Sequence, residues 1–229
     1  ARGLGRSYGD ASQLDQGTMF DLASFNEIVL DKDKCEVTAG AGISFAEILD
    51  FLIPLGFFLP VVPGTKFITL GGAIAFDVHG KNHHKDGSFG NFVKNLVIID
   101  GLSIIHQIGP DRNYSKDQSD MFWATVGGLG LTGLILKATF KVMKLETALM
   151  KVDTLRFQDI DSLMQSMRQI DKKFQYSVAW IDTLNFNSRG ILTCANHALK
   201  KDIEDDSKTN YLKFKSRSFI SVPSIFDLN

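Results

Sequence analysis

Cysteine is scarce in this chain, which contains only two among its 229 residues. Cys35 and Cys194 stand far apart, and neither belongs to a Cys-x-x-Cys pair. This spacing argues against a dithiol redox motif and against a zinc site with thiolate ligands. The two residues could pair if the fold brought them together, but we predict free, partly buried thiols.

The chain also lacks an excess of charge of either sign and any long hydrophobic run. Its 25 basic and 26 acidic residues give a formal net charge of −1, so we expect neither a nucleic-acid groove nor a polyanion-binding face. No apolar stretch reaches the length of a membrane span, and the N-terminus does not have the pattern of a signal peptide. With 44% hydrophobic residues, the chain can bury the core of one full domain and part of a second.

Two glycine-rich segments carry most of the chemical information. Residues 1–11 read ARGLGRSYGDA, which places glycines and two arginines around a serine, a tyrosine and an aspartate. Such a loop offers successive backbone N–H donors beside cationic side chains, an arrangement suited to a diphosphate. Residues 63–84 read PGTKFITLGGAIAFDVHGKNHH. Because Gly71 and Gly72 lack a β-carbon, their N–H groups could approach phosphate or ring oxygens. The alternative for this segment is a glycine bend in a buried strand.

The first part of the chain has an α+β pattern. Extended segments are expected over 27–30, 36–39, 57–62, 95–100, 102–107 and 134–143. We expect a hairpin turn at Asp100-Gly101, where a positive φ suits glycine. From Leu134 to Val142 every second residue is apolar, which predicts one buried face of an antiparallel strand.

Two helices are expected in the same part of the chain. Ser44 and Glu47 form a capping box, and Pro54 and Gly56 end the helix that follows it. A short helix is expected over 119–126, before a glycine-rich turn at 127–133.

The pattern changes near residue 147. A strand over 150–157 is followed by an amphipathic helix over 159–174 and by strands over 176–182 and 190–196. We therefore predict a domain over 1–146 and the beginning of a second α+β domain over 147–229. Because the chain begins without Met inside a glycine-rich loop, we expect an internal fragment of a longer enzyme, truncated at both ends.

The sequence Gly128-Leu129-Gly130-Leu131-Thr132-Gly133 matches the literal G-x-G-x-x-G dinucleotide motif. A Rossmann site needs a strand before this motif and a helix after it. Here the order is reversed, so we reject a nicotinamide dinucleotide site at this position.

A metal site at His79, His83 and His84 is also unfavoured. Gly80 and the extended pattern argue against a helix that would place His79 and His83 on one face. Adjacent histidines usually point in opposite directions, and no thiol or acidic cluster lies nearby in the sequence. We expect no metal.

Taken together, three blocks carry a resemblance to a known family: residues 1–10, residues 63–91 and residues 122–133. In this order they resemble the FAD-binding domain of the vanillyl-alcohol-oxidase type, also called PCMH-type, and most closely the decaprenylphosphoryl-β-D-ribose 2-oxidases. The resemblance covers roughly the first 145 residues and becomes sparse beyond them. It implies a PCMH-type FAD-binding domain made of two small α/β subdomains, followed by the start of a substrate domain.

The resemblance also implies the site residues. His79 would be the catalytic residue, a donor beside the flavin, although a satisfied and partly buried histidine is the alternative. Lys81 would lie on the substrate side of the ring, or else be solvated. The cofactor-binding residues implied are Ala1, Arg2, Gly3, Leu4, Gly5, Arg6, Ser7, Tyr8, Gly9, Asp10, Ala11, Gly64, Thr69, Leu70, Gly71, Gly72, Phe76, Asp77, Val78, His79 and, through its backbone, Ile135.

Two residues depart from relatives. Many members of the superfamily attach the flavin through a histidine where this chain has Arg6, so we expect noncovalent FAD. Phe76 replaces a cysteine of the mycobacterial oxidases, which puts substrate fit in doubt.

The activity implied is FAD-dependent oxidation of a sugar CH–OH carbon. The implied substrate is polyprenylphosphoryl-ribose, oxidised at C2 to a 2-keto sugar during synthesis of cell-wall arabinan precursors. The alternatives are an aldonolactone or alditol oxidase of the same superfamily and a non-catalytic FAD-binding partner module. We expect the fragment alone to be inactive. We expect a bacterial protein that is cytoplasmic or peripherally membrane-associated, and the candidate partner is a reductase or epimerase subunit.

Overall fold

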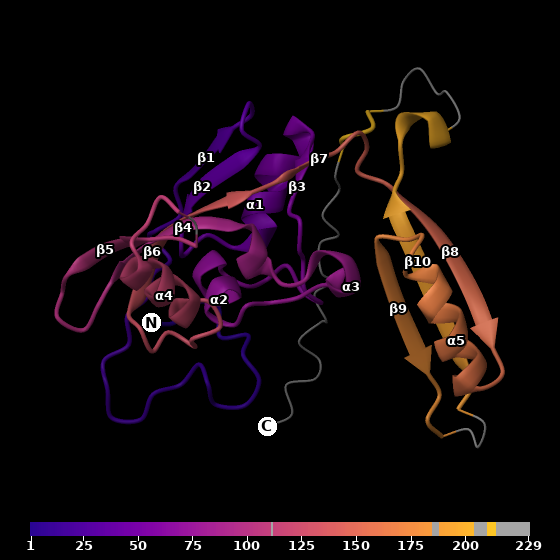
Figure 1. The fold of residues 1–229 in the computed structure, drawn as a ribbon, viewed down its shortest axis with the longest axis horizontal. Helices are drawn as coiled ribbons and strands as arrows, with labels where there is room; N and C mark the ends of the chain where they lie inside the picture. The colour runs from indigo at the N-terminus through magenta and orange to yellow at the C-terminus, as the bar shows by residue number, and fades with distance from the viewer. Residues whose placement is uncertain (111, 185–187, 204–209, 214–229) are drawn as a thin grey trace, which may run out of the picture.

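The first part of the chain is built on a five-stranded antiparallel sheet in the computed structural model, which describes residues 1–110, 112–184, 188–203 and 210–213. The strand order is β1-β2-β6-β4-β5 (Figure 1). The strands of this sheet are β1 (Ile28–Asp31), β2 (Glu36–Gly40), β4 (Val93–Ile99), β5 (Ile105–Ile108) and β6 (Leu134–Lys141). The short strands β3 (Phe57–Phe58) and β7 (Met143–Lys144) pair separately. The α+β class expected from the sequence is confirmed.

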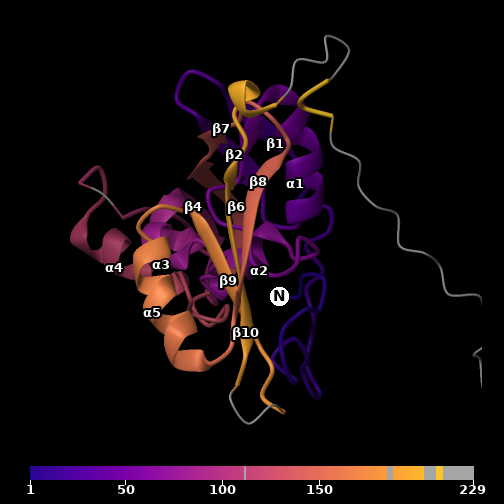
Figure 2. The same cartoon turned by 90° about the vertical axis from the view of Figure 1, so that its right-hand side faces the viewer.

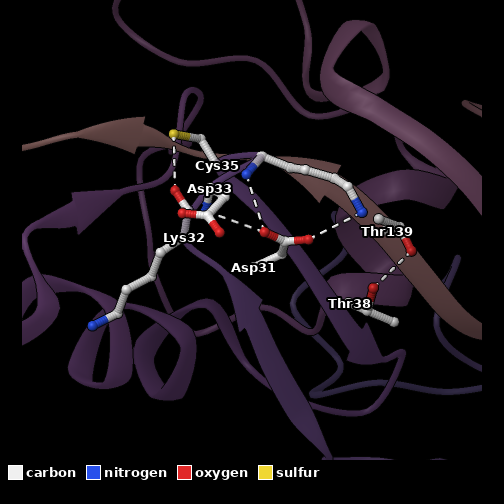
Figure 3. A network of polar contacts seen from close by, with 7 residues as sticks. Asp31, Lys32, Asp33, Cys35, Thr38 and Thr139 are labelled. Carbon is white, nitrogen blue, oxygen red and sulfur yellow. Dashed lines mark hydrogen bonds and ion pairs between the residues drawn. The ribbon is translucent and has the colours of Figure 1, made fainter.

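The β1–β2 hairpin is held at its turn by one aspartate (Figure 3). Asp31 Oδ1 accepts the backbone N–H groups of Asp33 and Lys34 at 3.1 and 3.0 Å, and Lys34 Nζ lies 3.1 Å from Asp31 Oδ2. Further along, Thr38 and Thr139 share a hydrogen bond of 2.9 Å between their hydroxyls. This bond ties β2 to its other neighbour, β6.

The β4–β5 hairpin is confirmed, but its turn differs from the sequence prediction. The residue with a positive φ is Ser103, at 64°, rather than Gly101. Asp100 Oδ1 accepts the N–H groups of Leu102 and Ile104 at 2.8 and 3.0 Å. The aspartate side chain therefore organises a turn wider than the expected two-residue turn.

Strand β6 has a break in its alternation that the sequence did not show. Val97 pairs with Lys137, whereas Ile98 pairs with Ile135, so the register shifts between these pairs. Ile135 is consequently buried, at 5% exposed, and Leu134 and Leu136 are only half-buried. The predicted alternation holds from Ala138 to Val142, since an extra residue at the bulge reverses the faces before it.

This part of the chain also contains α1 (Phe45–Leu52), α2 (Leu70–Ala75), α3 (His83–Asp86) and α4 (Lys116–Thr125), with 3-10 turns η1 (Ile53–Leu55) and η2 (Phe89–Phe92). Helix α2 contacts β2 and β6, and α4 contacts β5. The predicted capping box of α1 is confirmed, since Ser44 and Glu47 exchange both bonds. Helix α4 begins three residues earlier than expected, with a capping box at Ser115 and Gln118.

Aromatic rings join the helices to the sheet in one core. The Phe89 ring lies 5.1 Å from that of Phe45 and 5.5 Å from that of Phe140, measured between centroids. Completely buried apolar side chains around them come from α1, α2 and the strands β2 and β4: Ile48, Leu52, Leu70, Ile74, Val37, Leu96 and Ile98. Within the described residues no helix is long and apolar enough to cross a bilayer.

The second part is a three-stranded antiparallel sheet, in the order β8-β10-β9, with one helix on one face (Figures 1 and 2). It comprises β8 (Met150–Phe157), α5 (Ile160–Ile170), β9 (Tyr176–Ile181), β10 (Gly190–His197) and the 3-10 turn η3 (Lys200–Asp202). The expected strand–helix–strand–strand order is confirmed. On the apolar face of α5 only Leu163 is fully buried, and Met164 is 50% exposed. The mixed charges of residues 200–210 predict a solvated loop; this segment begins with η3, and residues 204–209 lie outside the described residues.

Both cysteines are free, as predicted. Cys35 is half-buried, has a φ of 52° and donates a long hydrogen bond of 3.6 Å from Sγ to Lys32 O (Figure 3). Cys194 is buried in β10, and this burial raises the pKa of its thiol. The carboxylates of Asp171 and Asp153 add to the effect of burial on the Cys194 pKa, so this thiol is not activated.

Candidate functional site

The Gly71-Gly72 segment is a short helix, not an extended strand. Thr69 caps α2, accepting the N–H of Gly72 on its hydroxyl at 3.2 Å. The N–H of Gly71 donates to Ala41 O at 2.8 Å, and that of Leu70 donates to Ile43 O at 2.8 Å. The expectation that the glycine N–H groups would be free for phosphate or ring oxygens is therefore wrong. The close approach to Ala41 gives Gly71 its role, since a β-carbon there would lie 3.0 Å from Ala41 Cβ.

The first loop packs onto the cap of α2. Gly3 lies so close to Thr69 that an added β-carbon would overlap the threonine hydroxyl. The N–H of Arg2 donates to Phe20 O at 3.0 Å, which anchors the start of the loop. The structure thus brings together the two segments that the sequence singled out, although they are more than sixty residues apart.

The glycine-rich turn at 127–133 joins the other end of α2. Gly127 and Leu129 donate their N–H groups to Ile74 O and Ala75 O, at 3.0 and 2.9 Å. The turn follows α4 and precedes β6, so the rejection of a Rossmann motif here is confirmed. Leu129 has a φ of 54° and is 57% exposed, and Phe76 nearby is 43% exposed. Leu129 was not among the site residues predicted from the sequence, although a leucine between two glycines is a pattern that the sequence does show.

Asp77, Val78 and His79 follow α2 and turn back along residues 88–90. The Asp77 carboxylate accepts Ser88 Oγ–H at 2.6 Å and Gly90 N–H at 2.8 Å. Val78 O accepts the N–H of Phe89 at 2.9 Å, and His79 forms an isolated antiparallel bridge with Ser88. The His79 side chain remains exposed. Sequence reasoning did not identify Ser88 and Gly90, because their contacts depend on the tertiary fold.

The three histidines are close in space but make separate contacts. No helix spans residues 79–83, yet the rings of His79 and His83 lie 5.0 Å apart. His84 points elsewhere, with Nε2 at 3.3 Å from Phe174 O and 3.9 Å from Asp171 Oδ1. Within the ranges described, no group of three or more His, Cys, Asp or Glu side chains is arranged to hold a metal ion.

Lys81 lies where the two parts of the protein meet. Its side chain is exposed, and its carbonyl accepts the N–H of Ser177, on the edge of β9, at 3.0 Å. Ser177 Oγ–H donates in turn to Asp171 at 2.7 Å. In Figures 1 and 2, α3 is the helix of the first part that lies nearest to α5 and β9.

The other residues that we expect to contact the cofactor differ in which of their groups a ligand could reach. Around Gly64 the space is open, so a ligand could reach its backbone. Leu70 has a completely buried side chain and a bonded N–H group, and Ile135 is also buried. Ile135 can therefore contribute only its backbone, as expected, and Leu70 only its carbonyl or its packing.

The first loop fits the diphosphate of a flavin dinucleotide. From Gly3 to Gly9, no backbone N–H donates to another group of the described residues. Among the described residues, no carboxylate forms an ion pair with Arg2 or Arg6; Arg2 Nη1 donates a long hydrogen bond of 3.8 Å to Met19 Sδ, and Tyr8 is fully exposed. Unused N–H donors with unpaired guanidinium groups beside them are what a diphosphate requires. Arg2, Gly3 and Leu4, with Met19 and Asp21, line a hollow of about 230 Å³.

Known proteins resemble this chain in sequence and in fold. Residues 1–109 match the family model of an FAD binding domain. The chain is 35% identical over 231 residues to decaprenylphosphoryl-β-D-ribose oxidase of Mycolicibacterium smegmatis, an alignment that covers 99% of this chain and 49% of the relative. An uncharacterized protein in the mprA 5′ region of Streptomyces coelicolor is 35% identical over 68% of this chain and 41% of its own length. The chain thus spans about half the length of these relatives.

A solved structure gives the same fold. Alkyldihydroxyacetonephosphate synthase in P1 superposes with a TM-score of 0.69 and covers 88% of this chain and 44% of its own, at 16% identity. This likeness concerns the fold alone. The family match and the similarity to the mycobacterial protein show that the chain contains a PCMH-type FAD-binding domain, has FAD as its cofactor and resembles decaprenylphosphoryl-β-D-ribose oxidase.

Proposed function

We propose that the full-length protein oxidises a CH–OH carbon of a sugar, and that polyprenylphosphoryl-ribose, oxidised at C2, is the substrate. One observation carries this proposal: the similarity to the ribose oxidase extends over 99% of the chain. The D-lactate dehydrogenase of Anaerostipes hadrus, by contrast, aligns over only 59%. Similarity that continues past residue 147 includes the part in which we propose the beginning of a substrate domain.

Bound FAD supplies the two-electron redox chemistry, and the residues of this chain would hold it and the substrate in place. The N–H groups of residues 3–9 and the guanidinium groups of Arg2 and Arg6 would bind the diphosphate. Thr69 and the backbone around Gly64 would border the cofactor. His79 would donate a hydrogen bond where negative charge develops, and the Lys81 ammonium would meet the phosphate of the substrate.

We further propose that FAD is held without a covalent bond, because Arg6 stands where a histidine would make one. In the same proposal, residues 1–146 bind FAD and residues 147–229 begin the substrate domain. A peripheral association with the membrane would suit a polyprenyl substrate, and a reductase or epimerase subunit could take the product.

The first experiment is an absorbance spectrum of the purified full-length protein before and after acid precipitation. We expect flavin bands that pass into the supernatant. Flavin retained in the pellet would contradict noncovalent binding, and a protein without flavin even after reconstitution with FAD would contradict the oxidase proposal.

Substrate choice is tested next, by flavin bleaching under anaerobic conditions. Polyprenylphosphoryl-ribose should bleach the flavin, and an aldonolactone or alditol should not. The reverse result would favour the aldonolactone or alditol oxidase. In the same assay, His79→Gln should slow bleaching, whereas His106→Gln, in β5, should not.

A further inference from the structure

Asp77 stands where the chain leaves α2, and its carboxylate is engaged inside the protein. Oδ2 accepts Ser88 Oγ–H at 2.6 Å, and Oδ1 accepts Gly90 N–H at 2.8 Å. The residue is half-buried. Hydrogen bonds to an ionised carboxylate are about twice as strong as neutral ones. Asp77 therefore ties the end of α2 to a turn that lies 11 to 13 residues further along the chain.

The backbone at Asp77 has an unusual conformation that reverses the chain. Its φ is 40°, in a region that non-glycine residues seldom adopt and that Asp and Asn tolerate best. The N–H groups of Asp77 and Val78 donate back to Ile74 O and Ala73 O, each at 3.0 Å. The reversal carries His79 to its bridge with Ser88. Such strain persists only where the surroundings fix it, and it is frequent at functional sites.

The surroundings of Asp77 are tightly packed. Gly90 is buried, and a β-carbon there would lie 2.8 Å from Asp77 Oδ1 and closer still to the Val126 side chain. A β-carbon at Gly127 would lie 3.5 Å from Asp77 Cβ. The carboxylate thus sits among the end of α2, the turn at 88–90 and the start of the glycine-rich turn.

We propose that Asp77 is a positioning residue for His79. It acts through Ser88 and Gly90, fixing the backbone of Val78 and His79 where the His79 imidazole faces the flavin. This role differs from the direct cofactor contact expected from the sequence, since both carboxylate oxygens already have partners. The proposal rests on the proposed function, because the task of His79 is part of that function.

The test compares Asp77→Ala, Asp77→Asn and Ser88→Ala in the full-length protein. The measurements are the FAD dissociation constant, the visible circular dichroism of bound FAD, and kcat separately from KM. Losing hydrogen bonds to a charged group should weaken FAD binding about tenfold or more in Asp77→Ala. The dichroism and kcat should change with it. Ser88→Ala, which removes one donor, should show a smaller change in the same direction.

Asp77→Asn should restore most of the wild-type behaviour. Asparagine tolerates the same φ, its amide oxygen can accept Gly90 N–H, and its amide N–H can donate to Ser88 Oγ. The matched control is Asp31→Ala, which removes a carboxylate that also accepts two backbone N–H groups, but in the β1–β2 turn (Figure 3). It should leave the dichroism and kcat unchanged.

Wild-type FAD affinity, dichroism and kcat in Asp77→Ala would overturn the proposal. If Asp77→Ala does not fold, the same result in Ser88→Ala overturns it. A wild-type protein that binds no FAD would contradict the proposed function instead. In that case amide hydrogen exchange still tests whether Asp77 holds the turn at residues 88–90. Exchange at Gly90 should be faster in Ser88→Ala than in wild type, and unchanged exchange would contradict the positioning role of Asp77.

Discussion

Gly3 and Thr69 meet at the point where the first loop touches α2. A β-carbon at Gly3 would overlap the Thr69 hydroxyl, which is already engaged as the helix cap. The family resemblance implied both residues as cofactor contacts, and the sequence pattern gave the glycines of the first loop and of α2 a different role, that of free backbone N–H donors. At Gly71 and Gly72 the N–H groups donate hydrogen bonds within the protein. At Gly3 the absence of a side chain is what allows the close contact with Thr69. Sequence alone shows a glycine but not what lies opposite its α-carbon.

Substituting Gly3 by alanine should therefore displace the first loop. Overpacking of this kind costs about 1–3 kcal/mol, so FAD binding should weaken by about fivefold or more. The measurement is a fluorescence titration of the apoprotein with FAD. Gly101→Ala is the control, because that position is open and has no positive φ. Equal affinities for the two variants would show that the loop tolerates a side chain at Gly3.

At the scale of elements, the sequence predicts best where local signals act alone. The capping box at Ser44 and the strand Met150–Phe157 are found as predicted. Helix α2 was missed because two glycines lower helix propensity, while burial of Leu70 and Ile74 stabilises the helix all the same. The bulge at Ile135 was missed because it depends on the register with β4. Both misses lie beside the candidate site, where tertiary contacts override local preference.

Two helix caps of similar strength should separate stability from cofactor binding. Thr69→Ala and Ser115→Ala each remove a hydroxyl that accepts a backbone N–H at the start of a helix, at 3.2 Å in both cases. Each should lower the free energy of unfolding by about 1 kcal/mol. Only Thr69→Ala should also weaken FAD binding, since Gly3 rests on Thr69. Thermal unfolding and FAD titration measure the two effects, and equal loss of FAD affinity in both variants would disprove the distinction.

The strands β9 and β10 carry a pH-sensitive pair at their ends. Tyr176 OH lies 3.0 Å from His197 Nε2, and the His197 ring packs edge-on against Phe58 at 5.0 Å. Burial raises the pKa of Tyr176 to about 12, with a smaller contribution from Asp86, and burial lowers the pKa of His197. Both shifts favour the neutral forms.

These shifts predict a stability plateau with two limits. Because the pKa of His197 is lowered in the folded protein, the free energy of unfolding is not reduced by this residue above pH 6.5, the ordinary pKa of histidine. It falls as the pH drops below that value. The raised pKa of Tyr176 gives stability that is complete below 10.0 and is lost as the pH rises toward about 12. Urea unfolding from pH 5 to 11 measures both. His197→Phe should reduce the acid loss and Tyr176→Phe the alkaline loss; unchanged profiles in these variants would assign the losses to other groups.

At the scale of the whole molecule, polar contacts join residues 81–84 of the first part to α5 and β9 of the second part. Ser177 N–H donates to Lys81 O, and Asp171 accepts Ser177 Oγ–H while lying 3.9 Å from His84. These residues follow His79 directly on one side and lie at the start of β9 and the end of α5 on the other. The sequence predicted both parts but not this group of polar contacts between them, here called the seam, because the residues in contact are separated by about ninety positions in the chain.

Asp171→Ala should loosen this seam without affecting the cofactor. The carboxylate is 28% exposed, and exposed ion pairs contribute at most about 1 kcal/mol, so KM for the proposed anionic sugar substrate should rise about two- to fivefold. FAD affinity should stay at the wild-type value, because the first loop and α2 do not touch Asp171. Asp161→Ala, which removes an exposed carboxylate from the other end of the same helix, should leave KM unchanged. Steady-state kinetics and FAD titration of the full-length protein decide the matter: a fall in FAD affinity at constant KM would mean that the seam supports the cofactor rather than the placement of Lys81.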